Sequence, residues 1–521
     1  MSIVLGPGPV SIEDICALAL KNEKVSLNPD PAFGQQVLDG MNFLDQLLAE
    51  DGHIYGVTTG YGDSVTRGVP AHLVAQLPVN LTRFHGCGLG NYFDKQTARA
   101  IMGARLVSLC QGYSGVSPEL LDQLVFFLNN DIVSVIPEEG SVGASGDLTP
   151  LSYVAANLIG EREVYHRGEK ISAAQALESH NRQPIRLRPK EGLAMMNGTA
   201  AMTGLACLCF ARAQYLLELA TRTTSLVSVA LKGNSFHFDE VLFGAKPHPG
   251  QQQIASWIRQ DLTQEQALKN SHRLQDRYSV RCAPHIIGVL ADAMPMFRQI
   301  IENELNSAND NPLIDVAGQR VLHGGHFYGG HIAFVMDSMK TLIANIADLL
   351  DRQMALLMDV KFNQGLPPNL SAAEEGRREI NHGFKAVQIG TSAWTAEALK
   401  QCMPASVFSR STECHNQDKV SMGTIAARDC LRVLQLTEQV QAAVLMAGYQ
   451  GVRLRIAQGE LAFSQLSIPL QQFMQQFAGD FELLTEDRPL EHELRAMVSK
   501  IQQRHWSIYQ SAKQQQPVAM A

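Results

Sequence analysis

The stretch Pro137-Glu-Glu-Gly-Ser-Val-Gly-Ala-Ser-Gly-Asp-Leu-Thr-Pro150 decides how this chain is interpreted. At its centre, Ala144-Ser145-Gly146 can close a five-membered ring if the loop bends tightly, because the Gly146 nitrogen can then attack the Ala144 carbonyl. One water leaves as the ring closes, and a second leaves with the Ser145 hydroxyl. The product is an exocyclic methylene conjugated to the ring, an electrophile that no ordinary side chain provides. Glycine suits this chemistry because it has no Cβ and reaches strained backbone angles.

The tripeptide alone is weak evidence, since the same three residues also occur in ordinary polar loops. Its surroundings strengthen the interpretation. Gly140 and Gly143 allow the backbone to fold sharply, and Thr149 and Pro150 are typical of an N-cap and the first residue of a helix. The loop would then lie at the positive end of a helix dipole, which favours negative charge on the ring.

The whole stretch resembles the 4-methylideneimidazole-5-one (MIO) signature of the aromatic amino-acid ammonia-lyases and aminomutases. That family includes histidine, phenylalanine and tyrosine ammonia-lyases, and the resemblance covers nearly the whole chain. It is strongest to the bacterial tyrosine and phenylalanine enzymes. The resemblance implies that the MIO group forms autocatalytically from Ala144-Ser145-Gly146, with no metal. It also implies an MIO-bearing N-terminal domain, a long central helical bundle, and a homotetramer whose active sites each draw on three chains.

The composition argues against several classes of protein. The chain has 521 residues, of which 45% are hydrophobic, which is ample for a large core. A net charge of −8 without basic blocks argues against nucleic-acid binding. The N-terminal stretch lacks the pattern of a secretory signal, and no uncharged apolar run reaches the ~18 residues of a membrane span. Nine scattered cysteines without framework spacing indicate a reduced, cytoplasmic protein.

The pattern of apolar residues changes after Asn197-Gly198. Before it, short helices, Gly-rich turns and brief strands alternate, with a capped helix start at Ser11. Strands are expected at 132–136 and 163–166. After it, runs rich in Ala, Leu and Met predict helices over 200–231, 284–306, 331–359, 385–401 and 420–453. We expect a mainly α fold with a mixed α/β N-terminal domain over 1–200 and a helical bundle domain over 201–521.

A second motif is Tyr55-Gly-Val-Thr-Thr-Gly-Tyr-Gly62. Taken alone it is a Gly-rich turn with a packed tyrosine, because a tyrosine of ordinary pKa near ~10 is a poor base and needs a lowered pKa for catalysis. The segment resembles the family's Tyr-Gly-x-x-Thr-Gly-Phe-Gly loop, whose first tyrosine removes the β-proton. The resemblance assigns that role to Tyr55 and places Gly62 at the substrate. Tyr61 stands where the family usually has phenylalanine.

A third motif is Gln275-Asp-Arg-Tyr-Ser-Val-Arg-Cys-Ala-Pro284. An arginine can bind a substrate carboxylate through two parallel hydrogen bonds, although an isolated arginine more often forms a surface salt bridge. The segment is similar to the family pattern Gln-Asp-x-Tyr-Ser-x-Arg. That pattern assigns the carboxylate clamp to Arg281 and a supporting role to Tyr278. His285 departs from the glutamine that the family commonly has there.

Two further segments would be interpreted as helix caps or turns if the family pattern were not considered. Glu191–Gly198 maps the family's active-site asparagine onto Asn197, and Glu304–Pro312 places Asn311 at the substrate. The segment Gly324-Gly-His-Phe-Tyr-Gly329 departs from the usual pattern at its third and fifth positions. His326 and Tyr328 replace the expected residues, so the wall of the pocket to which His326 and Phe327 are assigned is expected to differ. No metal site is expected from the nearby histidines, because no carboxylate or Cys ligand accompanies them.

Two places discriminate between substrates within the family. Histidine ammonia-lyases have a glutamate where this chain has Gln417, and an amide suits a neutral ring rather than an imidazole. Phe84-His85 occupies the two positions that the family uses to select its substrate, and it combines residues found in enzymes with different substrates. A buried histidine would lack a partner beside phenylalanine but could pair with the phenol of tyrosine. Alternatively, His85 bonds a neighbouring protein group and reads nothing of the substrate.

These residues favour an ammonia-lyase that converts L-tyrosine to trans-4-coumarate. Phenylalanine is the next substrate in order, followed by histidine. A tyrosine or phenylalanine 2,3-aminomutase would use the same residues, and nothing in the sequence separates it from a lyase. A non-enzymatic helical scaffold is the alternative from a different class, and it would not require the ring.

Overall fold

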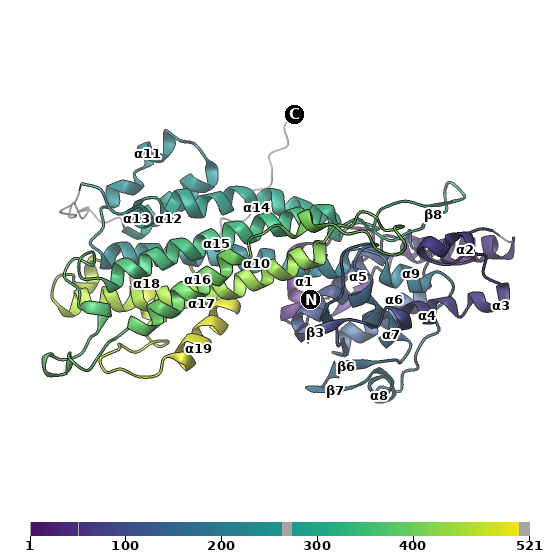
Figure 1. The fold of residues 1–521 in the computed structure, drawn as a ribbon, viewed down its shortest axis with the longest axis horizontal. Helices are drawn as coiled ribbons and strands as arrows, with labels where there is room; N and C mark the ends of the chain where they lie inside the picture. Colours follow the sequence, from purple (N-terminus) through teal and green to yellow (C-terminus); the bar gives the residue numbers. More distant parts are fainter. Residues whose placement is uncertain (1, 51, 263–273, 510–521) are drawn as a thin grey trace. The chain divides into compact units, whose positions relative to one another are not determined.

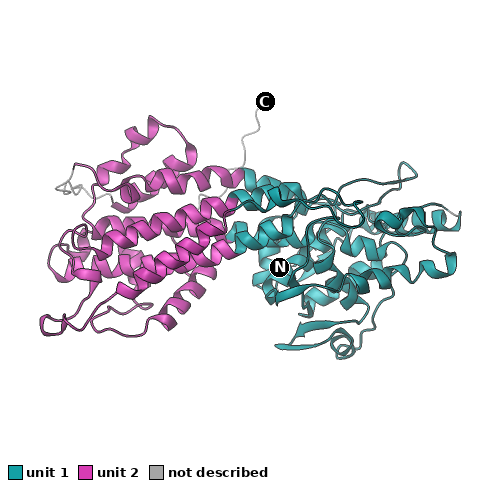
Figure 2. Cartoon of the chain, viewed as in Figure 1, with its two compact units in different colours: residues 1–211, 296–338, 403–431 teal, residues 212–295, 339–402, 432–521 magenta. Residues whose placement is uncertain are grey.

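The computed structural model describes residues 2–50, 52–262 and 274–509, and the chain is mostly helical, with 58% helix (Figure 1). It divides into two compact units, which Figure 2 draws in different colours. Unit 1 consists of residues 1–211, 296–338 and 403–431, and unit 2 of residues 212–295, 339–402 and 432–521. Each unit therefore takes in three separate stretches of chain, whereas the sequence suggested two continuous domains that meet at residue 200.

Unit 1 contains short helices and small sheets. Its helices are α1 (Ile12–Leu20), α2 (Pro31–Ala49), α3 (Ala71–Val74), α4 (Leu77–Phe84), α5 (Lys95–Leu109), α6 (Pro118–Asn129), α7 (Thr149–Leu158), α8 (Ala173–Glu178) and α9 (Glu191–Met196), with short 3₁₀ turns at Gly62–Thr66 and Ala405–Phe408. The capping box expected at Ser11 is confirmed, because its side chain accepts from the Asp14 N–H and the Asp14 carboxylate accepts from the Ser11 N–H.

The strands of unit 1 make four small sheets. They are β1 (Ile3–Leu5), β2 (Val25–Leu27), β3 (Leu89–Tyr92), β4 (Val133–Ser134), β5 (Pro137–Glu139), β6 (Glu163–His166), β7 (Glu169–Ser172), β8 (Leu313–Asp315) and β9 (Arg320–Leu322). β1 and β2 are parallel, while β3 with β5, β8 with β9, and β6 with both β4 and β7 are antiparallel. The strand expected at 163–166 is confirmed as β6, and the one expected at 132–136 is shorter.

Long helices supply the bundle. Four of them are divided between the units, namely α10 (Ala200–Ala230), α14 (Ala283–Leu305), α15 (Gly330–Met358) and α17 (Gly423–Ala457). Unit 2 also contains α11 (Glu240–Gly244), α12 (Pro249–Leu262), α13 (Tyr278–Arg281), α16 (Lys385–Lys400), α18 (Ile468–Phe477) and α19 (Glu491–Gln502), with 3₁₀ turns at Ser235–Phe238, Pro368–Leu370, Glu375–Arg377 and Phe463–Gln465. The five long helices predicted from the sequence are confirmed to within a few residues at each end.

Among the described residues, α10 alone is long and apolar enough to cross a membrane. Of its most apolar stretch, however, 89% is buried inside the structure, as expected of a core helix. Cys207 and Cys209, predicted to be core residues, are both fully buried in it. No disulfide joins the nine cysteines, all of which lie in the described part of the chain.

The start of α7 differs from the prediction. Thr149 is the first residue of the helix rather than its N-cap, and Pro150 is the second. Leu148 takes the cap position with φ +48° and offers no capping side chain. The reason is tertiary: the preceding Asp147 directs its carboxylate to the N-terminus of α10, where it accepts from the Ala201 N–H at 2.6 Å.

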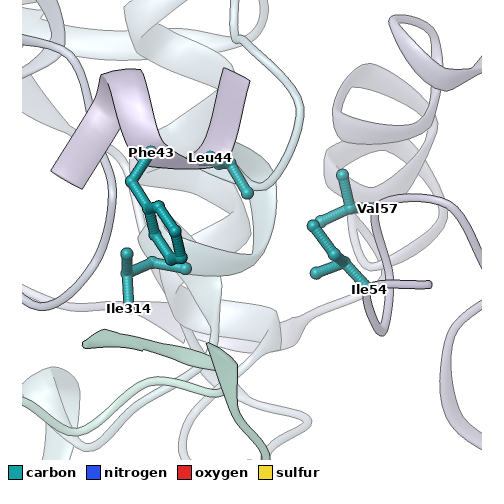
Figure 3. Close-up of a cluster of buried hydrophobic side chains, with 5 residues drawn as sticks. All are labelled: Phe43, Leu44, Ile54, Val57 and Ile314. Carbon is teal, nitrogen blue, oxygen red and sulfur yellow. The ribbon is translucent and has the colours of Figure 1, made fainter. Parts of the chain in front are cut away.

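A small hydrophobic cluster holds the turn that contains Tyr55. Figure 3 shows Phe43 and Leu44 on α2 above Ile314 of β8, with Ile54 and Val57 opposite them. All five side chains are at most 6% exposed. Because Ile54 and Val57 flank Tyr55 on either side, their burial fixes the position from which the tyrosine side chain projects.

Truncation of Phe43 should loosen that turn. We expect Phe43→Ala to lower the free energy of unfolding by about 3–5 kcal/mol, as large-to-small core substitutions do. Phe33→Ala is the matched control, since Phe33 is also buried on α2 but lies outside the cluster. Hydrogen exchange at the Val57 and Thr58 amides, both bonded to the Ile54 carbonyl, should accelerate more in Phe43→Ala. Equal acceleration in both variants would contradict the role of the cluster.

Candidate functional site

The tripeptide Ala144-Ser145-Gly146 lies in a tight bend that pairs with Gly198. The Gly198 N–H donates to the Ser145 carbonyl at 3.1 Å, and the Gly198 carbonyl accepts from the Asp147 N–H at 2.7 Å. Gly146 has φ +75°, in the left-handed region that favours glycine. A Cβ at this position would lie 2.0 Å from the Gly198 carbonyl oxygen, so only glycine fits there.

Residues just before α17 hold the other side of the bend. The Met422 N–H donates to the Val142 carbonyl at 3.0 Å, and the Ser421 N–H donates to the Gly143 carbonyl at 3.2 Å. Gly143 has φ +68°, and a Cβ there would lie 2.3 Å from the Ser421 hydroxyl. The bend is therefore fixed by backbone hydrogen bonds on both sides, and its two glycines are sterically required.

Asp147 connects this bend to two long helices. Its carboxylate accepts from the Ala201 and Met202 N–H groups at the start of α10 and from the Thr424 hydroxyl of α17 at 2.7 Å. The side chain is fully buried, and burial raises the pKa of its carboxyl to about 7. The donated hydrogen bonds and the charge of Arg105 oppose that rise.

The Tyr55 hydroxyl accepts a hydrogen bond from the Gly62 N–H at 2.8 Å. Gly62 has φ +56°, and a Cβ there would lie 2.3 Å from the Glu413 carboxylate, which also accepts from the Asp63 N–H at 3.0 Å. Burial raises the pKa of Tyr55, the Gly62 donor lowers it, and the negative charge of Glu413 raises it. The lowered pKa that the sequence argument required is therefore absent from this chain by itself.

A cavity of about 460 Å³ opens beside the bend, wholly within unit 1. The predicted site residues that line it are Tyr55, Gly62, Ala144, Ser145, Asn197, Asn311, Phe327 and Gln417. Asn197 is 2% exposed, and its side-chain oxygen is buried without a hydrogen-bond partner. A buried acceptor without a partner is costly, which is the condition of a group that awaits a ligand.

Gln417 contacts the tripeptide through its side chain. Its amide nitrogen donates to the Ser145 hydroxyl at 3.3 Å, and its amide oxygen accepts from the Thr412 hydroxyl at 3.0 Å. Asn311 faces the same cavity, with its side-chain oxygen held by the Gly324 N–H at 2.8 Å. The cavity is therefore lined by amides and a phenol beside the tripeptide, and the Gln417 position itself holds no carboxylate, although Asp418 and Lys419 also line the cavity.

Phe84 and His85 end α4 as an aromatic pair, with ring centroids 4.4 Å apart. Tyr61, in the Tyr55 turn, lies 6.4 Å from the Phe84 ring. The His85 Nδ1 lies 3.1 Å from the Leu81 carbonyl oxygen. Because a carbonyl oxygen can only accept, Nδ1 is the donor and carries the hydrogen. Burial lowers the pKa of His85, so the ring is neutral at pH 7 and its Nε2 carries a lone pair.

Six of the fourteen predicted site residues are not among those that line this cavity, namely Phe84, His85, Gly146, Tyr278, Arg281 and His326. His326 is exposed. Tyr278 and Arg281 belong to unit 2, where the Arg281 guanidinium carbon lies 4.8 Å from the centre of the Tyr278 ring. The Arg281 Nε is buried without a hydrogen-bond partner, so this guanidinium retains an unused donor.

The cavity also includes residues that the sequence analysis did not single out. Asn416, Asp418 and Lys419 adjoin Gln417, and His323 accepts from the Tyr55 N–H at 3.4 Å. Asn416 and Asp418 are the immediate neighbours of the predicted Gln417 in the sequence, and that position could have indicated both. Glu413 gave no signal, because its contact with Asp63 joins residues 350 positions apart.

Within the described residues, no three His, Cys, Asp or Glu side chains come close enough together to hold a metal ion.

The family model "Aromatic amino acid lyase" matches residues 10–478. The chain belongs to the aromatic amino acid lyase family. This membership supports a lyase enzyme with the ammonia-lyase and aminomutase fold.

Individual relatives of this lyase family member differ in their named substrates. A histidine ammonia-lyase of Gloeobacter violaceus is 38% identical over 87% of this chain and 88% of its own length. A tyrosine ammonia-lyase of Cereibacter sphaeroides is 34% identical over 88% and 90%. The solved phenylalanine aminomutase of Pantoea agglomerans superposes with a TM-score of 0.89 at 32% identity, over 96% and 99% of the two chains. The family is thus established more firmly than the substrate.

Replacement of Ser145 tests whether activity depends on a reactive ring formed from Ala144-Ser145-Gly146. Ser145→Ala removes the hydroxyl that must leave, so the protein should fold with an unchanged Tm and lose activity on aromatic amino acids by orders of magnitude. Ser141→Ala is the control for disturbance of the loop, because it removes the hydrogen bonds of Ser141 with the Thr424 hydroxyl and the Gly143 N–H but leaves the Ser145 hydroxyl in place. Near-native turnover by Ser145→Ala would overturn the assignment.

The charge of Glu413 gives a pH-dependence prediction. Glu413→Gln removes a negative charge that disfavours the phenolate, so the pKa of Tyr55 should fall. The rise of kcat with pH should move to lower pH, by less than about one unit because Glu413 is exposed to solvent. Glu169→Gln, on exposed β7, should leave the profile in place. A shift to higher pH in Glu413→Gln would contradict Tyr55 as the titrating base.

Proposed function

We propose that this chain is an MIO-dependent ammonia-lyase that eliminates ammonia from L-tyrosine to give trans-4-coumarate. One observation carries the proposal. Ala144 and Ser145 of the tripeptide line one cavity of about 460 Å³ together with Tyr55, Asn197 and Gln417. That volume is in the range of small-molecule sites.

The residues around the tripeptide fit formation of the MIO group. Gly146 has the left-handed backbone and the missing Cβ that a tight bend needs, and its N–H meets no acceptor among the described residues. Its nitrogen is thus available for attack on the Ala144 carbonyl, and both steps are dehydrations that need no oxidant. Once formed, the group supplies an electrophile for the amine of the substrate.

The other roles belong to side chains of this chain. Tyr55 takes the β-proton of the substrate, and Asn197 offers its unpaired oxygen as an acceptor. Arg281 binds the carboxylate, for which its partnerless Nε supports an unused donor. In the arrangement that the family resemblance implies, the Arg281 that serves each cavity comes from another subunit of a homotetramer. A guanidinium brought near Tyr55 would also lower its pKa, opposite to the effect of burial in a single chain.

His85 and Gln417 support tyrosine as the substrate. The neutral His85 uses Nδ1 on the Leu81 carbonyl, which leaves Nε2 as an acceptor suited to the O–H of a phenol. Gln417 supplies an amide where an imidazole substrate would call for a carboxylate. Most of the top-matching relatives are histidine ammonia-lyases, and this residue is the reason not to transfer their substrate to this chain. We place the reaction in the cytoplasm.

A 2,3-aminomutase is the second candidate, because the superposed Pantoea agglomerans enzyme carries that name. The same residues would serve, with the amine returned to the β-carbon. Product analysis separates the candidates: the purified chain is incubated with tyrosine, phenylalanine and histidine in parallel. The proposal expects 4-coumarate to form fastest. A β-amino acid would identify a mutase, and urocanate from histidine as the main product would overturn the tyrosine assignment.

His85→Leu tests substrate recognition. The phenol would lose a partner and face an apolar wall, at a cost of roughly 1–3 kcal/mol, whereas phenylalanine loses nothing. The ratio of kcat/KM for tyrosine over phenylalanine should therefore fall at least about tenfold, because ~1.4 kcal/mol corresponds to that factor. His180→Leu, in unit 1 beside His166, is the control. An unchanged ratio would show that His85 does not read the ring substituent.

A further inference from the structure

A buried arginine lies directly behind the bend that carries the tripeptide. Arg105, in the middle of α5, is 0% exposed. Its Nη1 donates to the Asn197 carbonyl at 3.2 Å and to the Asn309 side-chain oxygen at 3.1 Å. The same Asn309 oxygen accepts from the Ser108 hydroxyl at 3.2 Å and the Thr199 N–H at 3.4 Å. One guanidinium thus holds the backbone on both sides of Gly198.

Gly198 is the residue that pairs with the bend. Its N–H donates to the Ser145 carbonyl, and its carbonyl accepts from the Asp147 N–H. A Cβ on Gly198 would lie 2.2 Å from the Arg105 Nη1 and 2.4 Å from the Asn309 oxygen. The guanidinium therefore lies against the Gly198 backbone on one side, while the tripeptide is bonded to the other. The hydrogen bonds of Arg105 to Asn197 and Asn309 thus restrain the backbone next to Gly198.

The use of donors by Arg105 is uneven. Its Nε and Nη2 are buried without hydrogen-bond partners, so every bond that it makes in the described structure goes through Nη1 to residues 197 and 309. Its charge is balanced by two buried carboxylates, Asp147 and Asp310, the second of which is paired with Lys190 at 2.6 Å. Burying a guanidinium with two idle nitrogens is costly, which calls for a benefit other than packing.

We propose that Arg105 is a positioning residue for ring formation, which fixes Gly198 through Asn197 and Asn309 so that Gly198 holds Ala144-Ser145-Gly146 in the bent form that cyclises. The inference rests on the proposed function. Ring closure requires the Gly146 nitrogen and the Ala144 carbonyl carbon to approach closely, and misplacement by about 1 Å can cost on the order of a hundredfold in rate. Arg105 touches neither the tripeptide nor the cavity, so its effect passes through Gly198.

Arg99 provides a matched control on the same helix. It is 1% exposed, and it donates to the Leu18 and Leu128 carbonyls at 3.1 and 3.0 Å, neither of which borders the tripeptide. Arg99→Lys and Arg105→Lys both keep a buried cation and lose the guanidinium. Their general cost to folding should therefore be similar, while only Arg105→Lys releases Gly198.

The test measures ring formation in the full-length protein rather than activity. Wild type, Arg99→Lys and Arg105→Lys are recovered as unfolded chains from inclusion bodies, their tripeptide is shown by mass to be unmodified, and each is then refolded alone and sampled over time. The mass of the peptide that contains Ala144-Ser145-Gly146 reports the loss of water, and near-ultraviolet absorbance reports the conjugated ring. Far-ultraviolet circular dichroism and Tm report folding. We expect folded Arg105→Lys to form the ring at least tenfold more slowly than folded Arg99→Lys.

Equal ring formation in Arg105→Lys and Arg99→Lys would overturn the inference while leaving the proposed function intact. Absence of the ring in the wild type would overturn both. If Arg105→Lys does not fold, Asn309→Ala decides, because it keeps the buried cation but removes the side-chain acceptor that holds it. Slow ring formation in folded Asn309→Ala supports the role of Arg105, and wild-type ring formation in that variant contradicts it.

Discussion

The pairing of Gly198 with the Ser145 carbonyl and the Asp147 N–H is the interaction on which the rest of the site depends. It joins the loop that precedes α7 to the turn between α9 and α10, and it is possible only because neither Gly146 nor Gly198 has a Cβ. The buried Asp147 carboxylate then secures the same junction to α10 and α17. The long helices are in this way the frame that keeps one strained tripeptide bent.

The pKa of Tyr55 in the single chain is shifted in the direction opposite to the one that a catalytic base needs. Burial and the Glu413 carboxylate both raise the pKa of Tyr55, which makes the phenol a poorer base. Among the buried side-chain atoms without a hydrogen-bond partner in the described residues are the Asn197 oxygen beside the cavity and the Arg281 Nε in unit 2. A cationic donor brought to the cavity would offer a partner to the Asn197 oxygen. It would also lower the pKa of Tyr55, opposite to the effect of burial. The single chain thus combines a raised pKa of Tyr55 with unpaired polar atoms at Asn197 and Arg281.

Sequence reasoning predicted the long helices well, because runs of Ala, Leu and Met define them locally. It also predicted eight residues that line the cavity, and these came from motifs with a recognisable family pattern. It misjudged Thr149, because the capping role depends on where Asp147 points, and that is decided by α10. The roles of Gly198, Arg105 and Glu413 depend on contacts between distant parts of the chain, which no local pattern encodes. Likewise, the pKa direction of Tyr55 follows from burial, which a sequence motif does not contain.

The central claim is that the fold of this chain alone converts Ala144-Ser145-Gly146 into an electrophilic ring. Peptide mass spectrometry of the purified wild-type protein tests it most directly. The account predicts that the peptide spanning these residues is lighter than its sequence by two waters, one from ring closure and one from the Ser145 hydroxyl. A peptide of unmodified mass from fully folded protein would contradict the account.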